Sequence, residues 1–210
     1  MILRAGLTGG IASGKSTVRA LLGSLGCHTI DADRLVAELY EPGRAGHAAL
    51  RAAYGDLILR DDGTVDRAKL ANIAFADPAG TAKLNALIHP LVIEATEEKI
   101  DAIAHTHADG IVVVEATLMI ESGGRHRYDR IIVVDVDPTV QVERGIARGL
   151  TRDEVLRRIA HQIPREERLR HADYVIDNNG DSAALAREAR RVYALLVADL
   201  EAMRFSGARP

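Results

Sequence analysis

The chain has 210 residues, of which 47% are hydrophobic, and a formal net charge of −3. This length and composition suit one folded α/β domain with insertions and exclude a disordered chain. The weakly acidic balance, the interleaved charges and the absence of tryptophan argue against a nucleic-acid-binding protein.

The start of the chain runs directly into an apolar strand, without the charged segment and long apolar stretch of a signal peptide. No apolar run approaches the ~20 residues that a membrane span needs. The single cysteine, Cys27, cannot form an internal disulfide and is typical of a small core residue at the start of a strand. We therefore expect a cytoplasmic protein with no membrane partner. Nothing in the sequence indicates an oligomeric state.

The first predicted strand, residues 1–7, leads into a loop with the spacing Gly, four residues, Gly, Lys, Ser, and then into an amphipathic helix. The glycines let the backbone fold around a polyphosphate, so that amide N–H groups and the positive end of the helix face the anion. Lys15 would reach the β- and γ-phosphates, and Ser16 would offer its hydroxyl to Mg²⁺. The residues predicted to bind the nucleotide are Gly9, Gly10, Ile11, Ala12, Ser13, Gly14, Lys15, Ser16 and Thr17.

A second short strand, residues 27–30, runs into Asp31 and Asp33. Ligands gather beyond the carboxyl ends of parallel strands, so these carboxylates should lie near the nucleotide. One of them could accept the proton of an attacking hydroxyl group. Asp33 could equally cap the helix that begins at Arg34, and the spacing leaves both interpretations open.

Residues 41–108 contain short amphipathic helical pieces separated by breakers, which is too long for a plain crossover between strands. This excursion predicts a subdomain that covers the substrate. The pair His89-Pro90 interrupts a helical pattern, and Pro90 suits the first position of a new helix. His89 alone is more typical of a structural or capping residue. His105 and His107 have the spacing of one strand face but no third ligand, so we expect no metal site there.

The strongest strand signal is the β-branched run at 110–115, which predicts a strand buried on both faces. It ends at Glu115, where phosphate-loop proteins often hold the acidic residue that positions Mg²⁺. Residues 116–121 follow at the mouth of the predicted site. Further strands are predicted at 130–136 and 172–176.

Eight arginines lie between Glu143 and Arg170, interleaved with acidic residues, so most should belong to solvated helix faces. Arg144 and Arg148 are four apart on one predicted helical face, and guanidinium groups on a mobile lid stabilise the charge of a transferring phosphoryl group. A final helix, about 181–203, has a clear apolar stripe. Five strands separated by helices predict a three-layer α/β domain around a parallel sheet.

Four segments occur in the order of the signatures of the dephospho-CoA kinase family and resemble them: residues 7–17, 30–33, 84–90 and 174–180. The resemblance covers about residues 3–200. It implies a P-loop NTPase fold like that of nucleoside-monophosphate kinases, with ATP and Mg²⁺ as cofactors. It also implies that the substrate is dephospho-CoA, which is phosphorylated on the ribose 3′-hydroxyl.

The same resemblance implies roles for particular residues. Asp33 matches the general base, and His89 falls in the substrate pocket. Residues 34–108 match the substrate subdomain, which leaves 1–33 and 109–210 as the nucleotide-binding core. Arg144 and Arg148 fall in a lid over about 139–170, and Leu118 and Glu121 keep the pattern of a loop at the substrate site.

Three positions depart from the family pattern. Ala12 stands where the family usually has Gly, a change that is tolerable if φ is negative there. Thr117 replaces a common proline, and Glu115 stands where Asp is common.

Two other functions would share some of these features. Another small-molecule or nucleoside-monophosphate kinase would share the fold and the loop, and only the helical insertion would select a different acceptor. A non-catalytic nucleotide-sensing module, such as a GTP-driven switch, is disfavoured because the guanine-reading pattern Asn-Lys-x-Asp is absent.

Overall fold

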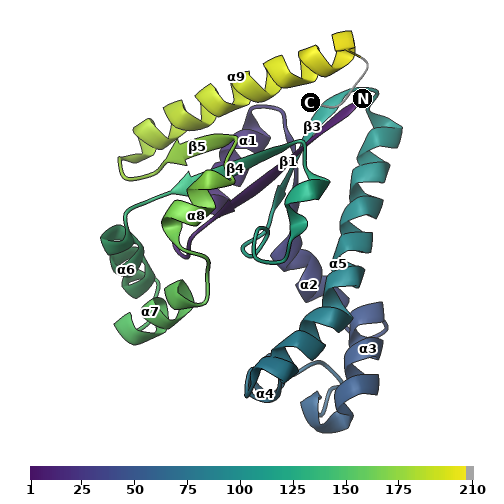
Figure 1. Cartoon of the computed structure of the whole chain (residues 1–210). Coiled ribbons are helices and arrows are strands. Elements are labelled where there is room, and N and C mark those ends of the chain that lie inside the picture. Colours follow the sequence, from purple (N-terminus) through teal and green to yellow (C-terminus); the bar gives the residue numbers. More distant parts are fainter. Residues whose placement is uncertain (207–210) are drawn as a thin grey trace. The chain divides into compact units, whose positions relative to one another are not determined.

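The computed structural model describes residues 1–206, which include a five-stranded sheet (Figure 1). The strands are β1 (Ile2–Gly9), β2 (His28–Asp31), β3 (Gly110–Glu115), β4 (Arg130–Asp135) and β5 (Tyr174–Asp177). They lie in the order β2-β3-β1-β4-β5, and all four pairings are parallel. The predicted parallel sheet and its five strands are therefore confirmed, and β3 has the predicted bounds.

Helices make up most of the remaining chain. They are α1 (Lys15–Ser24), α2 (Ala32–Leu39), α3 (Ala45–Tyr54), α4 (Arg67–Ala74), α5 (Pro78–Thr106), α6 (Pro138–Ala147), α7 (Arg152–Ala160), α8 (Arg165–Arg170) and α9 (Ser182–Ser206), with two 3₁₀ turns, η1 (Asp56–Ile58) and η2 (Gly124–Arg127). Within residues 1–206, no helix combines the length and the apolar character that crossing a membrane requires.

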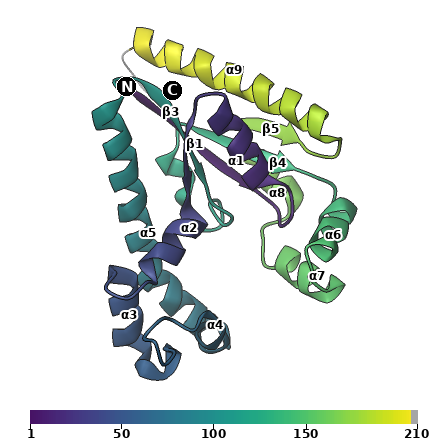
Figure 2. The ribbon, with the colours of Figure 1, turned by 180° about the vertical axis from the view of Figure 1, so that it is seen from behind.

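The two faces of the sheet are covered by different elements. α1 and α9 cover one face, and α8 lies on the opposite face, as the two opposed views show (Figures 1 and 2). Successive residues of β4 point to opposite faces, so Ile132 and Val134 join the cluster with α1 and α9 while Ile131 and Val133 pack with Met119. Each such side chain stabilises the fold by about 1.5–3 kcal/mol when fully buried. The predicted three layers are present.

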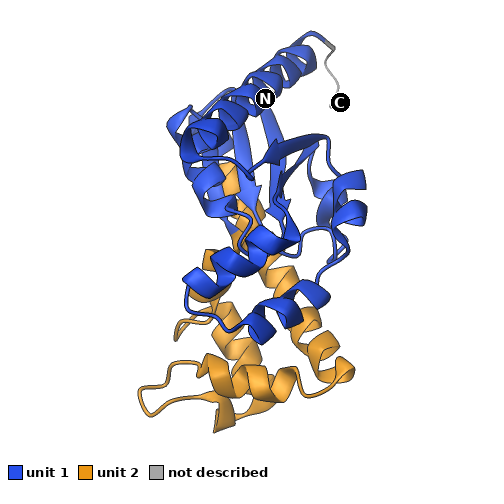
Figure 3. Ribbon diagram, turned by 90° about the vertical axis from the view of Figure 1, so that its left-hand side faces the viewer, with its two compact units in different colours: residues 1–31, 103–210 blue, residues 32–102 orange. Residues whose placement is uncertain are grey.

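Contacts divide the chain into two compact units, coloured separately in Figure 3. The first contains residues 1–31 and 103–210 and includes the sheet, and the second contains residues 32–102. The second unit has a hydrophobic cluster of its own. Its buried members are Leu50, Ile58, Val65, Leu70, Ala74, Leu84 and Ile88.

The predicted interruption at His89-Pro90 is wrong, because Pro90 lies inside the 29-residue helix α5. A proline inside a helix removes the hydrogen bond to the carbonyl of residue 86 and costs about 3 kcal/mol. Buried residues on both sides of it, Ile88 before and Thr96 and Ile100 after, hold the two halves of the helix in place. His105 also belongs to α5 and not to a strand.

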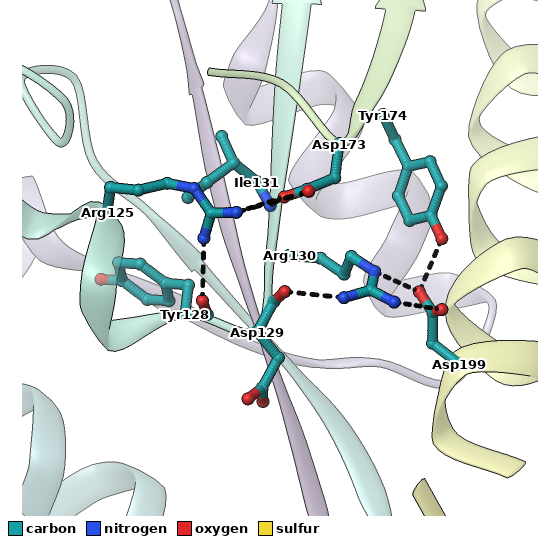
Figure 4. A network of polar contacts seen from close by, with 8 residues as sticks. All are labelled: Arg125, Tyr128, Asp129, Arg130, Ile131, Asp173, Tyr174 and Asp199. Carbon is teal, nitrogen blue, oxygen red and sulfur yellow. Dashed lines mark hydrogen bonds and ion pairs between the residues drawn. The ribbon is translucent and has the colours of Figure 1, made fainter. Parts of the chain in front are cut away.

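A network of charged groups ties α9 to the amino-terminal ends of β4 and β5 (Figure 4). Arg130 donates to both carboxylate oxygens of Asp199, at 2.9 and 2.7 Å, and Tyr174 Oη donates to the same carboxylate at 2.6 Å. Nearby, Asp173 accepts from Arg125 at 3.0 Å and from the backbone N–H of Ile131 at 2.7 Å. In a parallel sheet this edge is opposite the carboxyl ends of the strands, so the network serves stability.

Candidate active site

Residues 10–14, which we call the phosphate-type loop because they carry the phosphate-binding spacing, connect the end of β1 to the start of α1. The predicted order of strand, loop and helix is present. The loop is curled, since the N–H of Ser13 donates to the carbonyl of Gly10 at 3.2 Å. Gly14, with φ +94, precedes Lys15, the first residue of α1. The helix therefore begins directly from the loop, as an anion-binding helix N-terminus requires.

Two polar side chains from distant parts of the chain pack against this loop. A Cβ on Gly10 would lie 2.0 Å from Nε2 of Gln141, and a Cβ on Gly14 would lie 2.3 Å from Nδ2 of Asn178. Asn178 is buried, and its Nδ2 donates to the carbonyl of Ser13 at 2.7 Å. The two glycines are thus needed for this close packing, which fixes the path of the loop.

Ala12 adopts a left-handed backbone conformation with φ +56, and it is the one residue other than glycine with positive φ in the part of the chain that the structure describes. The condition under which alanine would replace glycine without strain, a negative φ, is therefore not met. The turn imposes this conformation on whatever residue is there, and an L-residue in it is strained by about 1–2 kcal/mol relative to glycine.

Lys15 lies across the loop and is 9% exposed. Its Nζ donates to the carbonyls of Gly9 and Gly10, at 3.1 and 3.2 Å. The ammonium group is therefore positioned beside the backbone of the loop. Ser16, the next residue, is exposed in the first turn of α1.

At the carboxyl ends of β2 and β3, Asp31 and Glu115 are neighbours in the strand register. Arg19 of α1 joins them, because its Nε donates to Glu115 at 2.6 Å and its Nη2 to Asp31 at 2.9 Å. Glu115, the predicted metal residue, is therefore an ion-pair partner of Arg19 as well.

The donor set fits Mg²⁺, since the Ser16 hydroxyl and the Glu115 carboxylate supply hard oxygen ligands. No group of three or more His, Cys, Asp or Glu residues among the described residues could hold a metal ion.

The predicted substrate residues are divided between the two units. Asp33, in the first turn of α2, and His89, on α5, are both exposed in the second unit. Asp33 is not the residue that precedes α2, so it does not occupy the N-cap position. In the first unit, Leu118 is 49% exposed, and Glu121 accepts a hydrogen bond from the backbone N–H of Ile163 at 3.2 Å.

The two predicted lid arginines do not share a helix. Arg144 lies in α6, and its Nη2 donates to the backbone carbonyl of Asn178 at 2.9 Å. Arg148 follows the end of α6, because Gly149, with φ +88, turns the chain and donates to the carbonyl of Ile146 at 2.9 Å. Arg148 is therefore the C-cap of α6, and the helix ends one residue before it at a glycine-terminated end.

The segment between α7 and α8 is bound to the phosphate-type loop. Gln162 Oε1 accepts from the backbone N–H of Ile11 at 2.9 Å. The carbonyl of the next residue, Ile163, accepts from Nη2 of Arg168 at 2.9 Å. Arg165 donates to both oxygens of Asp135, at 2.8 and 2.6 Å, and these bonds raise the pKa of Arg165.

A sequence model described as dephospho-CoA kinase matches residues 3–184. The chain belongs to this family. A protein named dephospho-CoA kinase from Corynebacterium glutamicum is 44% identical over 194 residues, which are 92% of this chain and 96% of that protein. One of the same name from Geobacter sulfurreducens is 42% identical and covers 90% of this chain and 96% of its own length.

Solved structures agree with this membership. A structure of dephospho-CoA kinase from Campylobacter jejuni superimposes with a TM-score of 0.69 at 25% identity, over 92% of this chain and 96% of that one. A Thermus thermophilus protein gives a TM-score of 0.81 at 32% identity, over the same shares of the two chains. Shikimate kinase from Acinetobacter baumannii, with a TM-score of 0.54 at 14% identity over 94% of each chain, shares the fold.

Four side chains that contact the phosphate-type loop or the nearby carboxylates were not among the site residues predicted from the sequence. They are Arg19, Gln141, Gln162 and Asn178. Asn178 directly follows β5, and a search of the residues that follow each strand would have found it. The other three are polar residues in or next to helices, and no local pattern separates them from solvated positions.

Proposed function

We propose that this protein transfers the γ-phosphoryl group of ATP to the 3′-hydroxyl of the ribose of dephospho-CoA, giving coenzyme A and ADP. Membership of the dephospho-CoA kinase family over residues 3–184 carries the proposal. The curled loop between β1 and α1 supports it, because the N-terminus of α1 begins directly from this loop and a helix N-terminus favours a polyphosphate.

The proposed chemistry assigns each group one task. The Asp33 carboxylate takes the proton of the ribose 3′-hydroxyl while that oxygen forms a bond to the γ-phosphorus and the bond to the ADP oxygen breaks. Lys15 and the loop of residues 9–17 hold the phosphates, and Arg144 and Arg148 add positive charge from a lid over about 139–170. Mg²⁺, held by Ser16 with Glu115 nearby, would neutralise charge on the phosphate oxygens.

Residues 34–108 are proposed to form the dephospho-CoA-binding subdomain, to which His89 belongs. Leu118 and Glu121, which follow β3 in the core formed by 1–33 and 109–210, are proposed to take part in substrate binding. We propose that the enzyme works in the cytoplasm.

Turnover with defined acceptors tests the proposed function. Purified protein with ATP and Mg²⁺ should release ADP with dephospho-CoA and not with AMP, CMP or shikimate. The product should serve an enzyme that requires the 3′-phosphate of coenzyme A, which establishes the position of transfer, and EDTA should abolish turnover. Lys15→Ala should remove activity, while Arg190→Ala, at an exposed position of α9, should retain it. Phosphorylation of a nucleoside monophosphate in place of dephospho-CoA would refute the assignment.

A further inference from the structure

Arg168, on the short helix α8, has its guanidinium group inside the protein beside the phosphate-type loop. The residue is 6% exposed. Its Nη2 donates to the carbonyl of Ile163, and its Nη1 lies 3.4 Å from the position of a Cβ built on Gly10. α8 therefore directs one arginine towards the loop that follows β1.

This buried cation is not neutralised by a neighbouring carboxylate. Within residues 1–206, no ion pair includes Arg168, and the two acidic groups whose charges act on it, Glu121 and Asp135, have other partners. Asp135 forms its bidentate pair with Arg165, and Glu121 accepts from the N–H of Ile163. Burial lowers the pKa of Arg168, and the more distant charges of Glu121 and Asp135 oppose that effect.

A guanidinium group cannot escape burial by losing its proton, because its pKa stays far above neutral pH. An unpaired buried charge is unfavourable, and it becomes favourable when an anion is placed beside it. Such a position is therefore expected where an anion binds during function.

The surroundings of Arg168 indicate which anion. Lys15 Nζ contacts the carbonyls of Gly9 and Gly10, so two cations flank the same stretch of backbone. Gln162, two residues after α7 ends, binds the N–H of Ile11 and holds the segment that leads to α8 against this loop. The strap 162–168, defined by these contacts, thus brings a positive charge to the place where a polyphosphate is expected.

We propose that Arg168 is a further phosphate-binding residue of the site, whose guanidinium contacts the polyphosphate of ATP at the loop and stabilises charge on the transferring phosphoryl group. The inference rests on the proposed function, and it adds a cation that lies outside the predicted pair Arg144 and Arg148. The Arg168 guanidinium would supply positive charge to the phosphates, and its hydrogen bond to the carbonyl of Ile163 would orient the side chain.

The test is the variant Arg168→Met, which keeps an unbranched apolar stem and removes the guanidinium group with its charge. Its melting temperature without nucleotide should equal or exceed that of the wild type, because replacing a buried unpaired charge by an apolar group is neutral or stabilising. Its affinity for a non-hydrolysable ATP analogue with Mg²⁺ should fall by about tenfold to a hundredfold, the worth of a charged hydrogen bond. The matched control is Arg190→Met, an exposed arginine of α9, which should change neither quantity.

If the role of Arg168 is purely structural, the effects on melting temperature and on nucleotide affinity should be reversed. Arg168→Met would then melt at a lower temperature without nucleotide and bind the analogue as tightly as the wild type, and this result would overturn the proposal. If Arg168→Met does not fold, Arg168→Gln decides, because it keeps a polar N–H donor at this position and lacks the charge. Wild-type affinity in that variant would also overturn the proposal. The binding measurement uses no dephospho-CoA, so its outcome is separate from the outcome of the acceptor test.

Discussion

Asp199→Asn should destabilise the protein by about 2 kcal/mol without changing turnover. In the network of Figure 4, the Asp199 carboxylate accepts two hydrogen bonds from Arg130 and one from Tyr174. Asparagine keeps one oxygen, turns an NH₂ group towards these donors and leaves the Arg130 cation without a counter-ion.

The magnitude follows from burial. Removing one partner of a fully buried pair costs about 3–5 kcal/mol, and we take roughly half of this because the side chains of Arg130 and Asp199 are 20% and 14% exposed. The matched control is Glu188→Gln, which breaks a pair with Arg191 whose side chains are 48% and 31% exposed. That pair should contribute less than about 0.5 kcal/mol.

Urea unfolding followed by circular dichroism measures both variants. A loss of about 2 kcal/mol corresponds to a fall in melting temperature of about 4–8 °C for a chain of this size. Turnover should be retained because the network lies at the amino-terminal edge of the sheet. Equal losses in Asp199→Asn and Glu188→Gln would refute the reasoning that burial sets the strength of the pair.

Three other predictions follow from the structure. Ala12→Gly should raise the free energy of unfolding, measured in urea, by up to about 1 kcal/mol. It relieves left-handed backbone strain of about 1–2 kcal/mol, and this outweighs the entropy of about 0.4–1 kcal/mol that glycine adds to the unfolded chain. A lower stability would contradict the inference that Ala12 is strained. Burial and the His107 ring, whose centroid lies 4.3 Å from that of His28, lower the pKa of His28 below 6.5. The free energy of unfolding should therefore decrease as the pH falls below about 6.5. In urea denaturation at several pH values, His28→Gln should reduce this dependence of stability on pH. Lys15→Ala should weaken ATP binding and turnover together, whereas Asp33→Asn should retain ATP binding and lose kcat. The control is Asp181→Asn, at an exposed position before α9, and full kcat in Asp33→Asn would exclude Asp33 as the base.

The sequence predicts the elements whose signal is local. The β-branched run of β3 predicts its bounds because a strand buried on both faces tolerates few polar residues. The glycine spacing predicts the loop before α1 because only a few residue types allow such a turn. Proline normally interrupts a helix, yet Pro90 lies inside α5, because packing on both sides of it outweighs the lost hydrogen bond.

The parts that the sequence does not predict depend on contacts between distant segments. Gln162 and Ile11 are 151 positions apart, and Asn178 and Ser13 are 165 apart. A glutamine or an asparagine has the same local signal whether it faces water or a loop. Pairings of this kind require the positions of whole elements, which are fixed by the burial of their apolar faces.

These distant contacts converge on one loop, and their number has a physical reason. A glycine-rich loop has high backbone freedom, so its ordered form must be held by bonds from outside. Asn178 holds the carbonyl of Ser13 and Gln162 holds the N–H of Ile11, while Lys15 bonds to two carbonyls of the loop itself. An ordered cradle binds an anion without a further entropy cost at the moment of binding. The polar groups around the loop are therefore expected to influence ATP affinity even where they touch no phosphate.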